Sequence, residues 1–284
     1  MSLTHQPKKF SVIHSQFSID SYLYPMNIKQ HIPNFITILN LICGVFAILF
    51  FIKTIFSSNT YTPDIPGMWY CFGPNTGNIE NGIWLILIAT VLDFLDGFAA
   101  RLLKVQSEIG AQLDSLADMV TFGVAPGFLF YAMCEVMYPE MGILKYLFLL
   151  IPIFSALRLA KFNVDMEQTT YFKGLATPAN TIFWIGIYFI IETPLFYYFA
   201  IYILTFFVIT MSLLMTSNLR MFSLKLKNLK LEGDNIYRVI LMLGAIVLTI
   251  IFGLFTNIMA AIPFIIILYI LLSIGYHYNT RKTK

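Results

Sequence analysis

Eight stretches of predominantly apolar residues run through this chain of 284 residues, and most approach the length needed to cross a membrane. A membrane-spanning helix needs about 20 such residues, because the hydrocarbon core of a bilayer is about 30 Å thick. The stretches fall at about 34–56, 82–103, 115–137, 144–162, 177–192, 195–217, 237–255 and 258–276. We therefore predict an all-α fold, a polytopic membrane helix bundle with about eight spans.

Composition supports this prediction. Apolar residues make up 58% of the chain and charged residues 12%, against about 25% charged in a typical soluble domain. A soluble protein would lack the polar residues to cover so much apolar surface. This excludes a soluble enzyme, a secreted disulfide scaffold and a disordered tail. The formal net charge of +3 is too small to indicate nucleic acid as a partner.

The basic residues predict the orientation, because Lys and Arg concentrate in cytoplasmic loops. With the N-terminus inside, sixteen of the eighteen fall on the cytoplasmic side, and only Lys53 and Lys145 lie toward the other. The sixteen are Lys8, Lys9, Lys29, Arg101, Lys104, Arg158, Lys161, Lys173, Arg220, Lys225, Lys227, Lys230, Arg238, Arg281, Lys282 and Lys284. We predict that both termini are cytoplasmic.

Two loops carry secondary expectations. The outer loop at about 57–81 is rich in turn-forming residues and contains Cys71, which could pair with Cys134 if that side is oxidising. The basic loop at 218–236 has two interpretations. Its positive charge either only orients the protein or also contacts anionic lipid head groups.

Four aspartates stand where a membrane helix should carry few charges, and such residues indicate a functional site. They are Asp93, Asp96, Asp114 and Asp118. At about 100° per residue, positions 93, 96, 97, 100 and 101 fall within an arc of roughly 140°, and 110, 114 and 118 form a narrower stripe. A short inner loop joins the two helices, so we expect antiparallel neighbours whose stripes face each other near the cytoplasmic side.

Several close carboxylates remain ionised together only if cations neutralise them. Oxygen ligands without His or Cys suit hard divalent ions such as Mg²⁺, Mn²⁺ or Ca²⁺. All four His lie near the termini, which argues against zinc chemistry and a His-based triad. Gly97, Ala100 and Gly110 leave room for a bulky ligand, and Arg101 can bind phosphate. Taken singly, these residues could also be interfacial, snorkelling or helix-packing residues.

The pattern Asp93-x-x-Asp96-Gly97-x-x-Ala100-Arg101, eight residues, then Gly110-x-x-x-Asp114-x-x-x-Asp118 resembles the signature of the CDP-alcohol phosphatidyltransferases. The flanking stretches 113–126, 157–163 and 172–179, with 32–40 near the first span, resemble the membrane-integral phosphatidylserine synthases. Ala176 and Lys161 depart mildly from that pattern, where Pro and Arg are usual.

The resemblance implies a six-helix catalytic core, usually a homodimer, that transfers a phosphatidyl group from CDP-diacylglycerol to L-serine. It implies two ions, Mg²⁺ or Mn²⁺, with Asp93, Asp96 and Asp114 as ligands and Asp118 on the second ion. Asp118 is also placed as the general base that takes the serine proton. The expected nucleotide and phosphate contacts are Gly97, Ala100, Arg101 and Gly110, with Asn40 as a further candidate. The expected contacts to the acceptor or lipid phosphate are Arg158, Lys161, Asn163 and Thr177.

We expect an N-terminal cytoplasmic segment (1–31), the core (32–217), the basic loop (218–236), two added helices (237–276) and a basic tail (277–284). The protein would be integral to the membrane, the cell membrane in a bacterium, with its active site at the cytoplasmic face. Two alternatives remain open. One is a related enzyme that uses glycerol 3-phosphate, an inositol phosphate, choline or ethanolamine. The other is a cation-coupled transporter with the four aspartates as its ion site.

Overall fold

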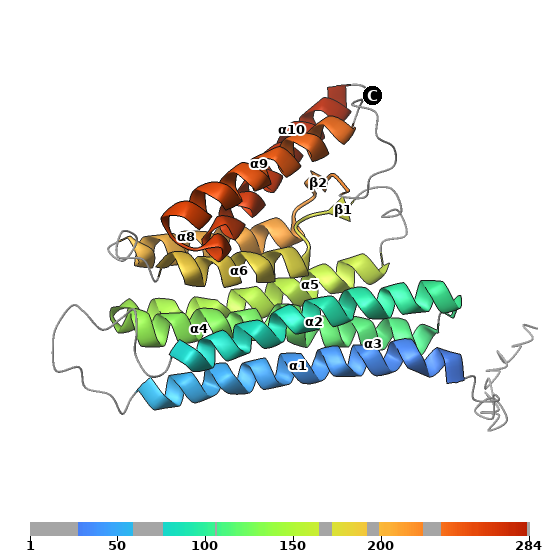
Figure 1. Cartoon of the computed structure of the whole chain (residues 1–284), viewed down its shortest axis with the longest axis horizontal. Coiled ribbons are helices and arrows are strands. Elements are labelled where there is room, and N and C mark those ends of the chain that lie inside the picture. The colour runs from blue at the N-terminus through green and yellow to red at the C-terminus, as the bar shows by residue number, and fades with distance from the viewer. Residues whose placement is uncertain are drawn as a thin grey trace, which may run out of the picture.

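The computed structural model describes residues 28–58, 76–105, 107–164, 172–191, 199–223 and 234–282. Within these ranges the chain is a bundle of long, roughly parallel and antiparallel helices, with a tilted C-terminal hairpin on one side (Figure 1). Six helical segments are long and apolar enough to cross a membrane, and Thr177–Ile191 and Ala200–Thr216 are shorter apolar helices. The predicted all-α membrane bundle is confirmed.

Each predicted span corresponds to a helical segment. The first two are α1 (Ile28–Ser58) and α2 (Thr76–Leu103). The third consists of α3 (Glu108–Asp118), η2 (Met119–Val124) and α4 (Ala125–Met137), and the fourth of η3 (Pro139–Leu149) and α5 (Leu150–Val164). The remaining ones are α6 (Thr177–Ile191), α8 (Ala200–Thr216), α9 (Asp234–Phe255), and η4 (Ile258–Ala261) with α10 (Ile262–Lys282).

The third span begins earlier than predicted, at Glu108 instead of residue 115. Ser107 caps α3: its side-chain oxygen accepts a hydrogen bond of 2.9 Å from the backbone N–H of Gly110. Such a cap satisfies one of the unpaired donors of the first helical turn. Because the helix starts here, Asp114 and Asp118 lie inside a continuous helical segment.

Two short strands form the one non-helical pairing in the described ranges. β1 (Phe172–Lys173) precedes α6, and β2 (Arg220–Met221) follows α8. They pair antiparallel, with Phe172 opposite Met221 and Lys173 opposite Arg220. The pairing joins two connections that lie more than forty residues apart in the chain.

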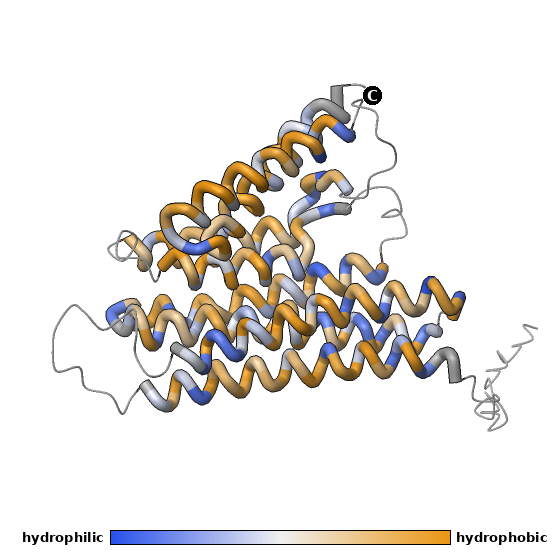
Figure 2. Tube along the Cα trace, in the orientation of Figure 1, coloured by the Kyte–Doolittle hydropathy of each residue, from blue (hydrophilic) through white to orange (hydrophobic). Residues whose placement is uncertain are grey.

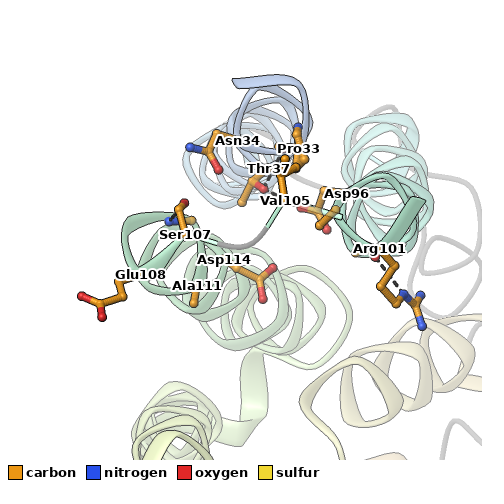
Figure 3. A pocket seen from close by; sticks show the side chains of 13 residues that line it. Pro33, Asn34, Thr37, Asp96, Arg101, Val105, Ser107, Glu108, Ala111 and Asp114 are labelled. Atoms are coloured by element: carbon orange, nitrogen blue, oxygen red, sulfur yellow. Dashed lines mark hydrogen bonds between the residues drawn. The ribbon is translucent and has the colours of Figure 1, made fainter. Parts of the chain in front are cut away.

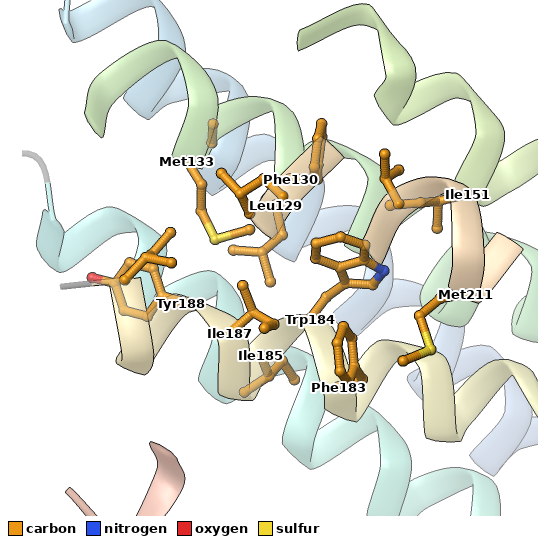
Figure 4. Close-up of a cluster of buried hydrophobic side chains, with 14 of the residues drawn as sticks. Leu129, Phe130, Met133, Ile151, Phe183, Trp184, Ile185, Ile187, Tyr188 and Met211 are labelled. Atoms are coloured by element: carbon orange, nitrogen blue, oxygen red, sulfur yellow. The ribbon is translucent and has the colours of Figure 1, made fainter. Parts of the chain in front are cut away.

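The core lies where α4, α5, α6 and α8 meet. Figure 4 shows the indole of Trp184 among the side chains of Phe130, Phe183, Ile151 and Met211. Trp184 meets the rings of Phe130 and Phe183 edge to face, at 5.1 and 5.5 Å between centroids. Edge-to-face contacts are a preferred geometry for aromatic pairs. This packing holds α4 against α6.

Hydrophobic residues predominate along the helices (Figure 2), and many of the large ones are exposed. On α9 the side chains of Ile246, Val247 and Ile250 are about half exposed. An apolar outer surface fits a bundle that faces lipid instead of water.

The cysteine prediction is only partly covered by the structure. Cys134 is buried in α4, whereas Cys71 lies outside the described residues. Most of the N-terminal segment and of the basic loop at 218–236 also lie outside them. Cys134 is a free cysteine in the structure. The suggested pairing with Cys71 and the roles of these segments stay hypotheses.

Candidate active site

Three of the four aspartates converge between α2 and α3, which both pack against α1. Asp93 comes from α2, and Asp114 and Asp118 come from α3, one turn apart. One carboxylate oxygen from each lies within 4.8 Å of the other two. The i, i+4 spacing on α3 and the antiparallel neighbour predicted this convergence. An unbound group of like charges at such range would be strongly destabilised.

Asp96, the fourth aspartate, is held beside this group by a contact that the sequence did not indicate. The Thr37 hydroxyl on α1 donates a hydrogen bond of 2.6 Å to Oδ2 of Asp96. Both side chains are buried, and Asp96 still interacts electrostatically with Asp93 and Asp114. Figure 3 shows Thr37 and Asp96 on facing helices, with Asp114 next to them.

The helix leaves its regular geometry directly after Asp118. The next six residues, Met119–Val124, form the π-helical turn η2. The hydroxyl of Thr181 on α6 donates a 3.0 Å hydrogen bond to the carbonyl of Phe122 in this turn. A π turn inside an α-helix shifts the side chains on either side of it and occurs often at functional sites. Here it fixes the position of Asp118 relative to α4.

A cavity of about 630 Å³ opens beside these carboxylates, between one end each of α1, α2 and α3 (Figure 3). The sequence predicts that these ends face the cytoplasm. Its size suits a ligand of small-molecule dimensions. The lining residues are Pro33, Asn34, Thr37, Asp96, Gly97, Ala100, Arg101, Val105, Ser107, Glu108, Gly110, Ala111 and Asp114. Two of the four aspartates therefore face the cavity directly.

The three small residues of the motif, Gly97, Ala100 and Gly110, all line this cavity. The two glycines differ in the space around them. A Cβ added at Gly97 would meet nothing within 4 Å, so the surface there is open to a ligand. A Cβ at Gly110 would lie 2.8 Å from Asn34 Oδ1 and from Ser107 Oγ, so a side chain here would displace Asn34 on α1 and the Ser107 cap of α3. Sequence reasoning had treated both positions alike.

Arg101 stands at the rim. Its side chain is exposed, lines the cavity and donates a 2.9 Å hydrogen bond from Nε to the carbonyl of Gly97 one turn earlier. This contact leaves the two terminal guanidinium nitrogens as donors for a bidentate contact with phosphate.

The residues present fit a hard divalent cation. The three converging side chains offer only carboxylate oxygens, which are the ligands that Mg²⁺ and Mn²⁺ prefer. Oδ1 of Asp118 is buried and has no hydrogen-bond partner among the described residues. A buried, unpartnered carboxylate oxygen is costly unless a cation or proton satisfies it.

Arg158 on α5 lies next to this group, close enough to interact electrostatically with Asp118. Its Nη1 donates a 3.2 Å hydrogen bond to the hydroxyl of Thr177, which is fully buried at the start of α6. Arg158 also lines a second cavity, of about 530 Å³, between the ends of α5 and α8. The structure thus brings two of the four predicted acceptor-side residues into direct contact.

The other two are close by but have different partners. Lys161 lines the second cavity, and its Nζ donates to the carbonyl of Thr216 at 3.1 Å. Asn163 Nδ2 donates to Ser115 Oγ at 3.0 Å, which ties the end of α5 to α3. Lys173 also lines the second cavity. It had been counted only as an orientation signal.

Asn40 does not line either cavity. Its side chain is fully buried on α1, and its amide oxygen and nitrogen have no hydrogen-bond partner in the described part of the chain. Its backbone carbonyl lies 3.4 Å from the hydroxyl of Thr121, in the π turn that follows Asp118. The structure therefore places Asn40 against the π turn that follows Asp118 and outside the wall of the first cavity.

Proteins with known names are similar to this chain over part of its length. A protein named CDP-diacylglycerol–serine O-phosphatidyltransferase from Bacillus subtilis is 38% identical over 149 residues, 52% of this chain and 70% of that protein. Proteins of the same name from Helicobacter pylori and Saccharomyces cerevisiae are 35% identical over 119 residues and 27% identical over 191 residues. These matches cover 41% and 64% of this chain, and 49% and 62% of those proteins.

A family model agrees with these relatives and covers more of the chain. The model described as CDP-alcohol phosphatidyltransferase matches residues 30–251, a range that includes all four aspartates and both cavities. This chain is a member of the CDP-alcohol phosphatidyltransferase family.

Proposed function

We propose that this protein transfers the phosphatidyl group of CDP-diacylglycerol to the hydroxyl of L-serine, which gives phosphatidylserine and CMP. The observation that carries the proposal is the convergence of Asp93, Asp114 and Asp118 beside a cavity between three helix ends. The relatives named for this reaction support serine as the acceptor.

The donor occupies the first cavity in this proposal. The nucleotide lies against the open backbone at Gly97 and the small side chain of Ala100, and Arg101 binds a phosphate oxygen. Gly110 contributes indirectly, because a side chain there would displace other residues of the cavity wall. The fully buried Asn40 contacts the π turn after Asp118 and makes no contact with the nucleotide in this arrangement.

Asp93, Asp96, Asp114 and Asp118 would hold two divalent ions, Mg²⁺ or Mn²⁺. Such ions, when bound, neutralise the negative charge that grows on the leaving CMP. Thr37 keeps one oxygen of Asp96 engaged, so this carboxylate stays oriented toward the cavity. The buried setting strengthens these electrostatic contacts, because little water screens them.

Asp118 takes the proton of the serine hydroxyl in the transfer step. A neutral hydroxyl is a weak nucleophile, so a positioned base is needed. The serine oxygen then forms a bond to the phosphorus that carries diacylglycerol, and the bond from that phosphorus to the oxygen of CMP breaks. CMP leaves with the electron pair. The unpartnered Oδ1 of Asp118 supports this assignment.

Arg158 recognises the serine carboxylate or the lipid phosphate. It lies between Asp118 and the second cavity, and Thr177 orients its guanidinium. Lys161 adds positive charge to the same cavity, and Asn163 holds the end of α5 against α3. In this proposal the anion-binding group, Arg158, lies next to the base, Asp118.

Catalysis belongs to residues 32–217 in this proposal, at the cytoplasmic face of the membrane. Arg101, Lys104, Arg158 and Lys161 lie at helix ends on the same side as the carboxylates, as the positive-inside rule requires. We also expect a homodimer, as is usual in the family. Native mass measurement in lipid nanodiscs tests the oligomeric state.

The experiment that tests the function is CMP release by purified protein. CDP-diacylglycerol is supplied with L-serine, glycerol 3-phosphate, inositol phosphate, choline or ethanolamine in turn, in detergent with Mg²⁺ or Mn²⁺. We expect serine to support the fastest release. Faster release with another alcohol would overturn serine as the acceptor. A lack of release with every alcohol would favour the transporter alternative, since transport needs a sealed membrane.

A further inference from the structure

The hairpin of α9 and α10 lies beyond the six-helix core, yet it reaches the segment that borders the second cavity. Its second helix, α10, packs against α6 and against β2 (Figure 1). The residue after β2, Phe222, is 1% exposed although it lies in a connection between helices. A fully buried aromatic side chain in a loop indicates that this loop is held in one place.

Three tyrosines of the hairpin surround Phe222. Its ring lies 5.0 Å from that of Tyr269, 6.0 Å from Tyr237 and 6.1 Å from Tyr276, measured between centroids. Tyr237 and Tyr276 also meet each other edge to face at 5.6 Å. We call these four residues the aromatic cluster. Each such contact adds stabilisation beyond the area that it buries.

The hairpin also bonds the backbone on both sides of Phe222. Tyr269 donates its hydroxyl to the carbonyl of Phe222 at 3.1 Å, and Arg238 Nε donates to the carbonyl of Ser223 at 2.6 Å. On the other side, the backbone N–H of Arg220 donates to Nδ1 of His277 at 3.2 Å. Side chains from both helices of the hairpin therefore fix the path of residues 220–223.

β2 connects these contacts to the segment that precedes α6. It pairs with β1, and the next N–H groups, of Gly174 and Leu175, donate to the carbonyls of Leu219 and Leu214 at 2.9 and 3.1 Å. Gly174 has φ +74°, and a Cβ there would lie 2.4 Å from the carbonyl oxygen of Met215. The segment thus lies tightly against the end of α8.

This segment, residues 172–176, borders the second cavity. Lys173 lines the second cavity together with Arg158 and Lys161, and Thr177, three residues after Gly174, accepts the hydrogen bond of Arg158. A continuous series of contacts runs from the aromatic cluster through β2 and β1 to Arg158. Arg158 in turn interacts with Asp118.

We propose that the α9–α10 hairpin positions the residues that line the second cavity, where the acceptor would bind. Phe222 and Tyr269 are the positioning residues. They act through β2 and β1 on Lys173 and Arg158. The inference deepens the proposed function and rests on it for the identity of the acceptor. It gives the two helices outside the core a role in acceptor binding and none in donor binding.

The first test needs no assumption about the reaction. Hydrogen–deuterium exchange is measured on the full-length protein in detergent for wild type, Phe222→Ala and Tyr269→Phe. Phe252→Ala is the control, because Phe252 stacks on Phe264 at 4.8 Å near the turn of the same hairpin. We expect Phe222→Ala to increase exchange at residues 172–176 by about tenfold and Tyr269→Phe by a smaller factor. Exchange at residues 110–118 should equal that of wild type in both variants. The Phe252→Ala control should equal wild type at both segments.

The second test separates positioning from general stability by kinetics. Phe222→Ala should raise the KM for serine by about tenfold while the KM for CDP-diacylglycerol stays within about twofold. Tyr269→Phe, which keeps the ring, should shift the serine KM in the same direction by less. The Phe252→Ala control should match wild type in both constants.

Three results would overturn the inference: unchanged exchange at 172–176 in both variants, an equal increase at 110–118, or an equal rise in both KM values. If Phe222→Ala does not fold, Tyr269→Phe carries both tests alone. Failure of the proposed function is distinct: wild type would then show no serine-dependent CMP release. The exchange experiment would still decide whether the hairpin holds the 172–176 segment.

Discussion

The hydroxyl of Thr37 donates a 2.6 Å hydrogen bond to Oδ2 of Asp96, across 59 residues of sequence. This bond links α1 to α2 at the wall of the first cavity, where Asp96 stands beside Asp114. It helps to fix the orientation of the buried Asp96 carboxylate. The activity proposed for the site depends on such orientation, because metal ligands need a defined geometry.

Thr37→Val should therefore weaken the binding of divalent ions without unfolding the protein. Valine keeps the shape of threonine but removes the hydroxyl, so Asp96 loses its donor. A hydrogen bond to a charged group contributes about 1.5–3 kcal/mol, which predicts an increase of about tenfold or more in the Mg²⁺ concentration for half-maximal activity. Titration of CMP release with Mg²⁺ measures it.

Thr54→Val is the matched control for this prediction. Thr54 is also buried on α1. Its hydroxyl donates to the carbonyl of Phe50 in its own helix and not to an aspartate. Its Mg²⁺ requirement should equal that of wild type. An equal shift in both variants would mean that Thr37 affects only helix stability.

Asp118→Asn should abolish transfer and leave donor binding largely intact. The amide cannot accept the serine proton, and loss of a general base costs about a hundredfold to ten-thousandfold in rate. The turnover number and the binding of CDP-diacylglycerol are measured on the same preparation. Glu80→Gln, at the opposite end of α2 and exposed, is the control. Near-normal turnover in Asp118→Asn would remove the general-base role.

The two motif glycines should respond differently to added bulk. In Gly110→Ala the added Cβ would lie 2.8 Å from Asn34 Oδ1 and Ser107 Oγ and would displace both side chains. Ser107 caps α3, and loss of an N-cap contact costs about 0.5–2 kcal/mol. Gly97→Ala enters open space and should leave the midpoint of thermal unfolding unchanged or slightly raised, because alanine favours helix. Unfolding in detergent, followed by circular dichroism, separates the two.

Gly97→Leu extends this prediction to the ligand. Leucine would project into the first cavity, so the KM for CDP-diacylglycerol should rise while the unfolding midpoint remains close to that of Gly97→Ala. Comparison of the two substitutions at one position isolates the volume of the side chain. An unchanged donor KM in Gly97→Leu would place the nucleotide elsewhere.

Removal of divalent ions should silence the enzyme reversibly. EDTA would leave the three converging carboxylates without a counter-charge, and their mutual repulsion would disorder the site. CMP release should fall to background with excess chelator and return when Mg²⁺ or Mn²⁺ is added back. Activity that persists in excess EDTA would contradict the two-ion scheme.

The sequence alone predicted the helical bundle and the convergence of Asp93, Asp114 and Asp118 well. Both depend on local periodicity: apolar runs of membrane length, and carboxylates spaced at i, i+4 on neighbouring antiparallel helices. The third span begins at Glu108, before the predicted residue 115, as the helical stripe at 110, 114 and 118 and the N-cap residue Ser107 both indicate.

Other parts of the site depend on contacts between distant segments and could not be predicted from local patterns. The bond between Thr37 and Asp96 joins two helices, and nothing in the residues near Thr37 specifies its partner. The π turn after Asp118 could not be predicted, because local residue preferences do not distinguish a π-helical turn from an α-helical one. The pairing of β1 with β2 involves two-residue strands, which are too short to show alternation.

The most direct test of the central claim is product analysis with isotopically labelled serine. Wild type and Asp118→Asn are incubated in detergent with CDP-diacylglycerol, Mg²⁺ and the labelled amino acid, and lipids and nucleotides are quantified by mass spectrometry. We predict labelled phosphatidylserine and CMP in equal amounts from wild type and neither from Asp118→Asn. CMP without labelled lipid from wild type, or equal labelled product from both proteins, would contradict the account.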